Sequence, residues 1–147
     1  MRADLNPVAS WLKTERDCRL WSGSRVSFPV DLTSLPDEIE FEIARSWCAE
    51  VDGRLGGFVQ LVPKPLGRLH LARLIVAPGE RGRGLGRWLA GRMVDLAHSS
   101  SSALSLNVDP ANAPALAVYK RLGFLVMARP ADEPPSTSLY MEHRDHA

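Results

Sequence analysis

The sequence has almost no excess charge and very little cysteine. Its 147 residues include 18 Lys and Arg against 17 Asp and Glu, for a formal net charge of +1. Such a balance provides no broad basic face, so we expect no nucleic-acid partner. The two cysteines, Cys18 and Cys48, lack the spacing of metal ligands. We expect both to be reduced and structural, and we expect no metal site.

Long apolar runs are also absent. No segment of 18 apolar residues occurs, and Arg2 and Asp4 interrupt the N-terminus early. These features predict neither a membrane-spanning helix nor a signal sequence, so we expect a cytoplasmic protein with no membrane partner. A chain of 147 residues that is 45% hydrophobic corresponds to a single domain. It is long enough to bury about two thirds of its unfolded surface.

The most informative stretch is a glycine-rich segment between an apolar run and an amphipathic pattern. Residues 74–76 are apolar and predict a buried strand, which Pro78 ends. A helical stripe runs to about residue 98 through Leu85, Leu89, Met93 and Leu96. Glycines at 82, 84 and 86 and arginines at 81, 83 and 87 lie at this junction. Backbone amides, a helix N-terminus and positive side chains together favour a phosphate or pyrophosphate ligand.

The spacing of the glycines selects among phosphate-binding loops. The dinucleotide pattern G-x-G-x-x-G fails because Arg87 occupies the last position. A P-loop is excluded because the glycine-rich loop contains no lysine. The remaining pattern is Arg-x-x-Gly-x-Gly, formed by Arg81, Gly84 and Gly86. It resembles the acetyl-CoA pyrophosphate loop of the GNAT N-acetyltransferase superfamily. The alternative is a solvated turn with no ligand.

The other elements follow from periodicity and turn residues. We expect a short helix from Asn6-Pro7 continuing to about residue 15, a loop-rich segment over 18–30, and a second short helix after Thr33 and Ser34. Residues 44–51 and 57–62 predict a hairpin around Asp52-Gly53, in which residues 54–56 lengthen the loop or add a bulge.

The second half of the chain predicts a parallel strand pair and a final hairpin. A strand over 68–76, a helix over 85–98 and a strand over 103–108 form a βαβ unit with parallel strands. A helix from about Ala113 to Gly123 follows. Two further strands, 124–129 and 137–143, flank a proline-rich loop. The predicted fold class is therefore α/β, a mixed sheet with helices on both faces.

A second motif lies in the 109–124 unit. Asn112 and Tyr119 are seven residues apart, about two helical turns, so a helix places both on one face. Their spacing, with Ala115, Gly123 and Phe124, is similar to the GNAT segment in which asparagine and tyrosine flank the pantetheine arm. That resemblance implies that Tyr119 is the general acid. Alternatively, Asn112 is only a helix N-cap and Tyr119 only a half-buried aromatic.

The resemblance implies a GNAT-like fold, with residues 1–40 as acceptor-side helices, 41–129 as the CoA-binding core and 130–147 as the C-terminal hairpin strand. In this family the pantetheine of acetyl-CoA bonds to the central strand, and the two parallel strands splay. We expect the two strands to splay near Val76 and Asn107, and we expect a bulge to cause the splay. A strand amide near Val76 could then stabilise the tetrahedral oxyanion. The implied cofactor-binding residues are Leu74, Ile75, Val76, Arg81, Gly82, Arg83, Gly84, Leu85, Gly86, Arg87 and Asn112.

The implied function is transfer of acetyl from acetyl-CoA to a primary amine, with a small molecule as the expected acceptor. A phenol such as Tyr119 is suited to protonate the departing thiolate. Asp109, Glu42 and His70 are the candidate bases, since an alkyl ammonium with a pKa of about 10.4 must lose a proton first. The alternatives are acetylation of a protein N-terminus or lysine, and a non-catalytic module that binds acyl-CoA.

Two segments depart from the family pattern. Members usually open with a full strand, whereas only residues 1–3 precede the first predicted helix here. The first strand is then missing or a stub, and the open sheet edge favours a homodimer. The acceptor site of such enzymes is formed by the first helices and the last hairpin, which carry no motif. There, Asp132 and Glu133 either attract a cationic amine or are simply solvated.

Overall fold

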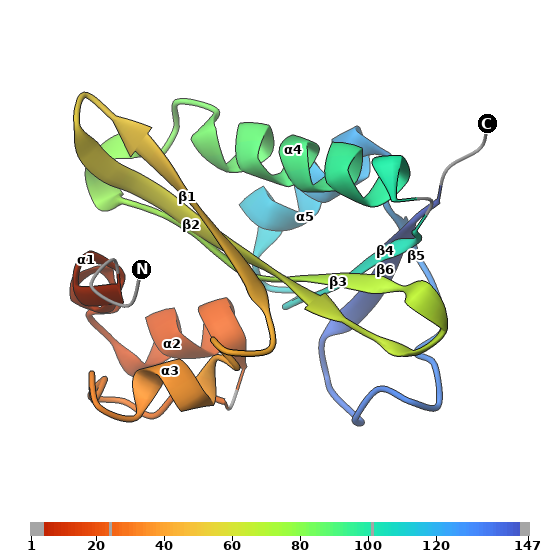
Figure 1. Ribbon diagram of the computed structural model, residues 1–147, viewed down its shortest axis with the longest axis horizontal. Helices are drawn as coiled ribbons and strands as arrows, with labels where there is room; N and C mark the ends of the chain where they lie inside the picture. Colours follow the sequence, from red (N-terminus) through yellow and green to blue (C-terminus); the bar gives the residue numbers. More distant parts are fainter. Residues whose placement is uncertain (1–4, 24, 101, 145–147) are drawn as a thin grey trace.

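A six-stranded mixed sheet forms the centre of the protein (Figure 1). The computed structural model describes residues 5–23, 25–100 and 102–144. Strand order is β1-β2-β3-β4-β6-β5. The strands are β1 (Arg45–Val51), β2 (Arg54–Pro63), β3 (Leu69–Val76), β4 (Leu104–Val108), β5 (Leu125–Val126) and β6 (Leu139–His143). The helices are α1 (Leu5–Trp11), α2 (Glu15–Ser22), α3 (Leu35–Glu38), α4 (Leu85–Ser99) and α5 (Ala113–Leu122).

Helices cover both faces of the sheet, as predicted, because alternate strand residues point to opposite sides. On one face, Val59 and Leu61 of β2 join a core with Leu89 and Met93 of α4. On the other face, Phe58 joins a second core built from α1, α2 and α3. Figure 1 shows these three short helices grouped on the side of the sheet opposite α4. Within the described part of the chain, no helix has the length and apolar character needed to cross a membrane.

The predicted parallel pair is confirmed, and it separates early. β3 and β4 pair only at Leu69–Leu104, His70–Ser105 and Leu71–Leu106. Beyond this point β3 continues to Val76 without a parallel partner. The expected splay near Val76 and Asn107 therefore begins several residues earlier on β3. A bulge accompanies it, because the β2–β3 register jumps between the pairs Phe58–Ile75 and Gln60–Ala72.

The predicted N-terminal helix is wrong in its extent. The chain forms two helices, and α2 occupies part of the segment predicted to be loop-rich. Thr14 ends the first segment and starts α2 with a capping box. Its hydroxyl accepts from the Asp17 N–H at 3.0 Å, and Asp17 Oδ2 accepts from the Thr14 N–H at 3.1 Å. The predicted short helix after Ser34 is confirmed as α3.

The first hairpin confirms one of the two predicted alternatives, and the second differs from the prediction. Residues 54–56 belong to β2 and do not lengthen the tight Asp52-Gly53 turn, but they do contain a bulge: the β1–β2 register shifts between Ala49 and Glu50, opposite Gly56. The strand predicted over 124–129 shrinks to Leu125–Val126, because the chain leaves the edge after the Met127 N–H donates to Tyr140 O. The predicted helices at 85–98 and 113–123 are confirmed as α4 and α5.

The question of a first strand concerns residues 1–3, which lie outside the described residues. In the described part of the chain, α1 begins at Leu5 and the sheet begins at β1. β1 is thus one edge of the sheet as described. The homodimer suggested by an open edge stays a prediction.

Gly57 provides a test of how closely α4 packs on the sheet. A Cβ built on Gly57 would lie 2.6 Å from Leu89 Cδ1, and Leu89 is only 2% exposed. We predict that Gly57→Ala lowers the free energy of unfolding by about 1–3 kcal/mol through overpacking. Gly79 is the matched control, since a Cβ there meets nothing within 4 Å. Urea titration measures the free energy of unfolding of both variants. Gly79→Ala is expected to change it by less than about 0.5 kcal/mol. Equal losses for both variants would contradict the packing argument.

Candidate functional site

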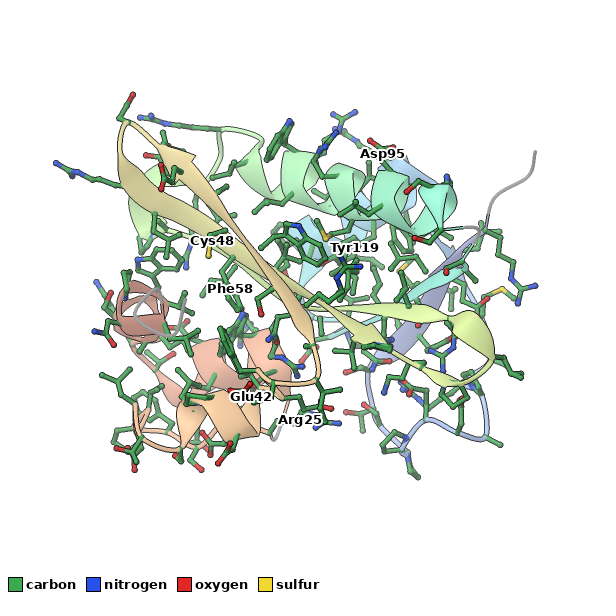
Figure 2. All side chains as sticks on the ribbon, in the orientation of Figure 1. Arg25, Glu42, Cys48, Phe58, Asp95 and Tyr119 are labelled. Atoms are coloured by element: carbon green, nitrogen blue, oxygen red, sulfur yellow. The ribbon has the colours of Figure 1, made fainter. Side chains whose placement is uncertain are left out.

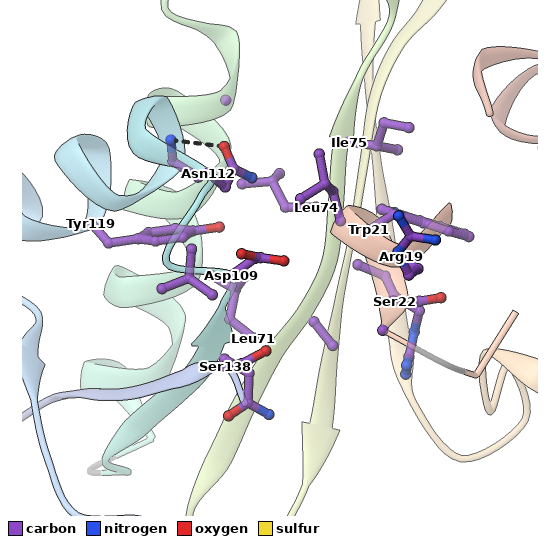
Figure 3. Close-up of a pocket in the computed structure, with 18 of the residues that line it drawn as sticks. Arg19, Trp21, Ser22, Leu71, Leu74, Ile75, Asp109, Asn112, Tyr119 and Ser138 are labelled. Carbon is purple, nitrogen blue, oxygen red and sulfur yellow. Dashed lines mark hydrogen bonds between the residues drawn. The ribbon is translucent and has the colours of Figure 1, made fainter. Parts of the chain in front are cut away.

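A continuous cleft of about 880 Å³ opens where β3 and β4 have separated. Figure 3 shows Leu74 and Ile75 of β3 on one side of it, with Asp109, Asn112 and Tyr119 on the other. One end is formed by the loop between β3 and α4, and the other end by α2 and the segment before β6. The geometry therefore joins the two sequence motifs across the unpaired edge of β3.

The glycine-rich loop has the backbone conformation expected of an anion-binding turn. Gly82 and Gly84 have φ angles of +79° and +85°, which favour glycine, and Gly84 is the N-cap of α4. The first turn of α4 thus directs its free N–H groups toward the cleft end. Arg87 lines the cleft. Arg83 is absent from the cleft wall, and its exposed guanidinium lies 3.8 Å from Glu80.

Arg81 fixes the loop to the end of the central strand. Its Nε donates to Val76 O at 3.0 Å. The next residue along the strand, Ala77, donates its N–H to Gly56 O at 2.8 Å, on the β2 side. Because successive N–H groups along a strand point to opposite edges, the Val76 N–H faces the gap left by β4. The strand therefore presents backbone hydrogen-bonding groups to the cleft.

Tyr119 reaches the cleft from within the core. The side chain is 7% exposed and packs edge-on against Phe124, with ring centroids 5.7 Å apart. Figure 2 shows it inside the molecule, beneath α4. Burial raises the pKa of Tyr119 to about 12, so the hydroxyl stays protonated at neutral pH. A protonated phenol that lines a cleft can donate its proton to a ligand bound there.

Asn112 and Asp109 are tied to the backbone at the start of α5. The Asn112 side-chain oxygen accepts from the Ala115 N–H at 3.4 Å, which makes it the N-cap of the helix. Asp109 Oδ1 accepts from the Ala111 N–H at 2.8 Å. Both residues also line the cleft. Asn112 therefore has the capping role that the sequence left open, at a position beside Tyr119 in the same wall.

The sequence profile of the acetyltransferase (GNAT) family matches residues 8–124. The match includes both motifs and the two strands that separate. The chain belongs to the GNAT acetyltransferase family.

Individual relatives agree with this GNAT assignment. The chain is 38% identical over 99 residues to the mycothiol acetyltransferase of Thermomonospora curvata, covering 64% of this chain and 32% of that protein. It is 40% identical over 75 residues to the streptothricin acetyltransferase of Streptomyces lavendulae, covering 50% of this chain and 40% of that protein. The chain thus spans about a third and two fifths of these relatives' lengths.

Solved structures show the same GNAT fold. A crystal structure of the aminoglycoside acetyltransferase AAC(6')-Ib in complex with coenzyme A superposes with a TM-score of 0.72. The superposition covers 98% of this chain and 91% of that chain at 20% sequence identity. At this identity the similarity concerns the fold alone.

Of the three candidate bases, the GNAT cleft contains two. Glu42 is exposed and does not line it, whereas Asp109 and His70 do. His70 Nδ1 lies 2.7 Å from Ser105 Oγ, and Nε2 lies 3.4 Å from Asn107 Nδ2. Burial lowers the pKa of His70 to about 3, with help from nearby cations. A group that holds a proton so weakly is a poor base for an ammonium.

Several cleft residues escaped the sequence reasoning. Arg73 lies at the bulge with a φ of +54°, and its buried Nε donates to Gln60 Oε1. An arginine within an apolar strand was the available signal. Glu133 was expected to be solvated or free for an amine, yet its side chain is 2% exposed and lies 3.0 Å from Lys64 Nζ. The cleft is also lined by Trp11, Trp21, Arg25, Glu40, Arg129 and Ser138.

The depressed pKa of His70 predicts a pH-dependent stability. Between pH 6.5 and 3, His70 is protonated in the unfolded chain but stays neutral in the folded protein. The free energy of unfolding therefore decreases as the pH falls through this window. We expect the His70 ring signals not to titrate from pH 8 to 5 by NMR. The wild type should lose about 2 kcal/mol more unfolding free energy than His70→Asn between pH 7 and 5. A ring that titrates near pH 6.5 would contradict this.

Proposed function

We propose that the chain is an acetyl-CoA-dependent N-acetyltransferase that acts on the primary amine of a small molecule. The observation that carries the proposal is the unpaired edge of β3, which faces Tyr119 across a cleft ending at the glycine-rich loop. The mycothiol and streptothricin acetyltransferases to which the chain is similar have names that refer to small molecules. These similarities support the acceptor class and leave its identity open.

The residues present fit acetyl-CoA as the co-substrate. The free N–H groups at the start of α4, with Arg87, suit the pyrophosphate, and Leu74 and Val76 present backbone groups to the pantetheine arm. Side chains on β3 contribute little to this contact, because the strand bonds through its backbone. Arg81 holds the loop against Val76, so we assign it to positioning the loop.

The chemistry forms a C–N bond between the amine and the acetyl carbonyl and breaks the C–S bond of the thioester. The Val76 N–H is directed into the gap and is assigned to stabilise the negative charge that develops on the carbonyl oxygen. Tyr119 is assigned to donate its proton to the leaving sulfur, which departs as the free thiol of CoA. An acceptor that arrives as an ammonium loses two protons. One leaves to water before the attack, and the second, released when the C–N bond has formed, returns by way of water to the Tyr119 phenolate and restores the phenol.

Loss of the first proton sets an energetic cost. Forming the neutral amine at pH 7 costs about 4–5 kcal/mol for an alkyl ammonium with a pKa of about 10.4. The cost is only about 1 kcal/mol for an amine with a pKa near 8. Asp109 lines the cleft with Tyr119, and we assign it to hold the ammonium group before it reacts. Acceptors whose amine has the lower pKa are therefore expected to react faster.

Tyr119→Phe tests the assigned acid. Because general acids contribute about 10²–10⁴ to rate, we expect kcat to fall about 10²-fold or more while the KM for acetyl-CoA changes less than about threefold. Tyr140→Phe is the matched control. Tyr140 is also buried and has a pKa raised to about 12, but it lies outside the cleft. Unchanged turnover in Tyr119→Phe would refute the acid role, and acetyl-CoA binding without turnover by the wild type would favour a non-catalytic binding module.

Gly84→Glu tests the phosphate loop. A carboxylate at the cleft end should repel a pyrophosphate and raise the Kd for acetyl-CoA at least about tenfold in a calorimetric titration. Gly67 is the matched control, because its φ of +75° and its open surroundings resemble those of Gly84 while it lies outside the cleft. Gly67→Glu should leave the Kd unchanged. An unchanged Kd in Gly84→Glu would place the ligand's phosphates elsewhere.

A further inference from the structure

Cations dominate the end of the cleft farthest from the glycine-rich loop. His70 lies there, and the four positive side chains that lower its pKa are Lys64, Arg68, Arg73 and Arg129. Lys64, Arg73 and Arg129 line the cleft directly. These four side chains lie around one buried ring, and we call this part of the protein the cationic end.

The carboxylates at the cationic end are already neutralised by the protein. Glu133 lies 3.0 Å from Lys64 Nζ. Glu40 Oε1 lies 2.9 Å from Arg25 Nη1 and 3.5 Å from Arg73 Nη2. Arg68 Nη2 donates to both carboxylate oxygens of Asp132, at 3.1 Å to Oδ1 and 3.2 Å to Oδ2. A polycationic acceptor would find no uncompensated carboxylate among these three groups.

Arg129 retains hydrogen-bonding capacity toward the cleft. Its Nη1 donates to Asn107 Oδ1 and its Nη2 to Ser138 O, both at 2.8 Å, so two neutral oxygens hold the guanidinium in place. A guanidinium has five N–H donors, which leaves three for a ligand. No carboxylate of the described residues forms an ion pair with it. Arg129 is therefore a fixed, partly exposed cation with open donors.

Arg73 adds a second, deeper charge. Its side chain is 4% exposed, and its Nη2 forms an ion pair with Glu40 Oε1 at 3.5 Å without a well-aligned hydrogen bond. The residue adopts a φ of +54° at the bulge where β3 leaves β4. Strained backbone at such a position is typical of sites where a bulge redirects a side chain for function. Arg73 thus lies at the bulge and lines the cleft.

We propose that the acceptor is a small amino acid or a close derivative, whose carboxylate binds Arg129 within the cationic end while its amine lies toward Asp109 and Tyr119. A carboxylate suits a guanidinium because both are planar and form paired N–H···O bonds. Asn107, which orients Arg129, is two residues before Asp109 on the same strand end. Arg129, held by Asn107, thus binds the carboxylate of the acceptor, and the nearby Asp109 binds its ammonium group. This inference rests on the proposed acetyltransferase function and specifies its substrate class.

The test compares acceptors that differ only in the carboxylate. Thiol release is measured with acetyl-CoA and L-lysine, lysinamide or cadaverine, with the corresponding ornithine series, and with an aminoglycoside. We expect kcat/KM for the acids to exceed that for the amides and diamines at least tenfold. The comparison with the amides is the decisive one. An amide lowers the pKa of the neighbouring amine and so favours its reaction, whereas the alkyl amines of a diamine have a pKa of about 10.4 and react more slowly for that reason alone.

Arg129→Gln makes the test specific to the proposed contact. We expect kcat/KM for the acids to fall at least tenfold, the amides to change less than threefold, and the acid preference to disappear, with the KM for acetyl-CoA unchanged. Arg129→Lys, which keeps the charge and loses the planar fork, should retain part of the preference. Arg92→Gln is the control, an exposed arginine on α4 outside the cleft, and should behave as wild type.

Each outcome separates the two proposals. Amides, diamines or the aminoglycoside reacting as well as the acids would overturn the inference and leave the acetyltransferase function standing. An equal loss for every acceptor in Arg129→Gln would show a structural role and would also overturn it. No thiol release with any amine would overturn the proposed function, and the inference with it.

Discussion

The functional architecture depends on the separation of β3 from β4 after the Leu71–Leu106 pair. A parallel pair that continued to Val76 would use the backbone groups of β3 within the sheet and leave no cleft. The bulge at residue 73 changes the course of β3 while its pairing with β2 continues to Val76. Because β3 stays paired with β2 on its other side, the backbone of the free edge is held in place. A ligand that adds to this edge meets groups that are already in position.

The separation also divides the cleft by charge. At one end, the N-terminus of α4 and Arg87 provide positive potential suited to phosphates. At the other end, Arg73 and Arg129 lie around His70, whose low pKa reflects burial and the same field. Tyr119 lies between the two ends with a protonated hydroxyl. The order of these groups along the cleft is the one that the proposed transfer from acetyl-CoA to an acceptor amine requires.

Sequence patterns predicted the parts of the site that depend on contacts between residues close together in the chain, namely the glycine-rich loop, α4 and the shared helix face of Asn112 and Tyr119. The glycines at 82 and 84 need positive φ angles, and the apolar stripe from Leu85 fixes α4, so the loop and helix were predictable. Asn112 and Tyr119 share a face because of helical periodicity alone. Arg73 was not predictable in the same way. Its position depends on a bulge, on Gln60 from the next strand and on Glu40 from a distant loop. The burial of Glu133 likewise depends on Lys64, far away in sequence.

Amide hydrogen exchange with and without acetyl-CoA tests the central claim most directly. If the free edge of β3 and the loop after it form the binding site, acetyl-CoA should slow exchange at residues 74–76 and 82–87. Amides of β1, at the far edge of the sheet, should exchange as before. Binding that protects other segments while these amides exchange unchanged, or no binding at all, would contradict the account.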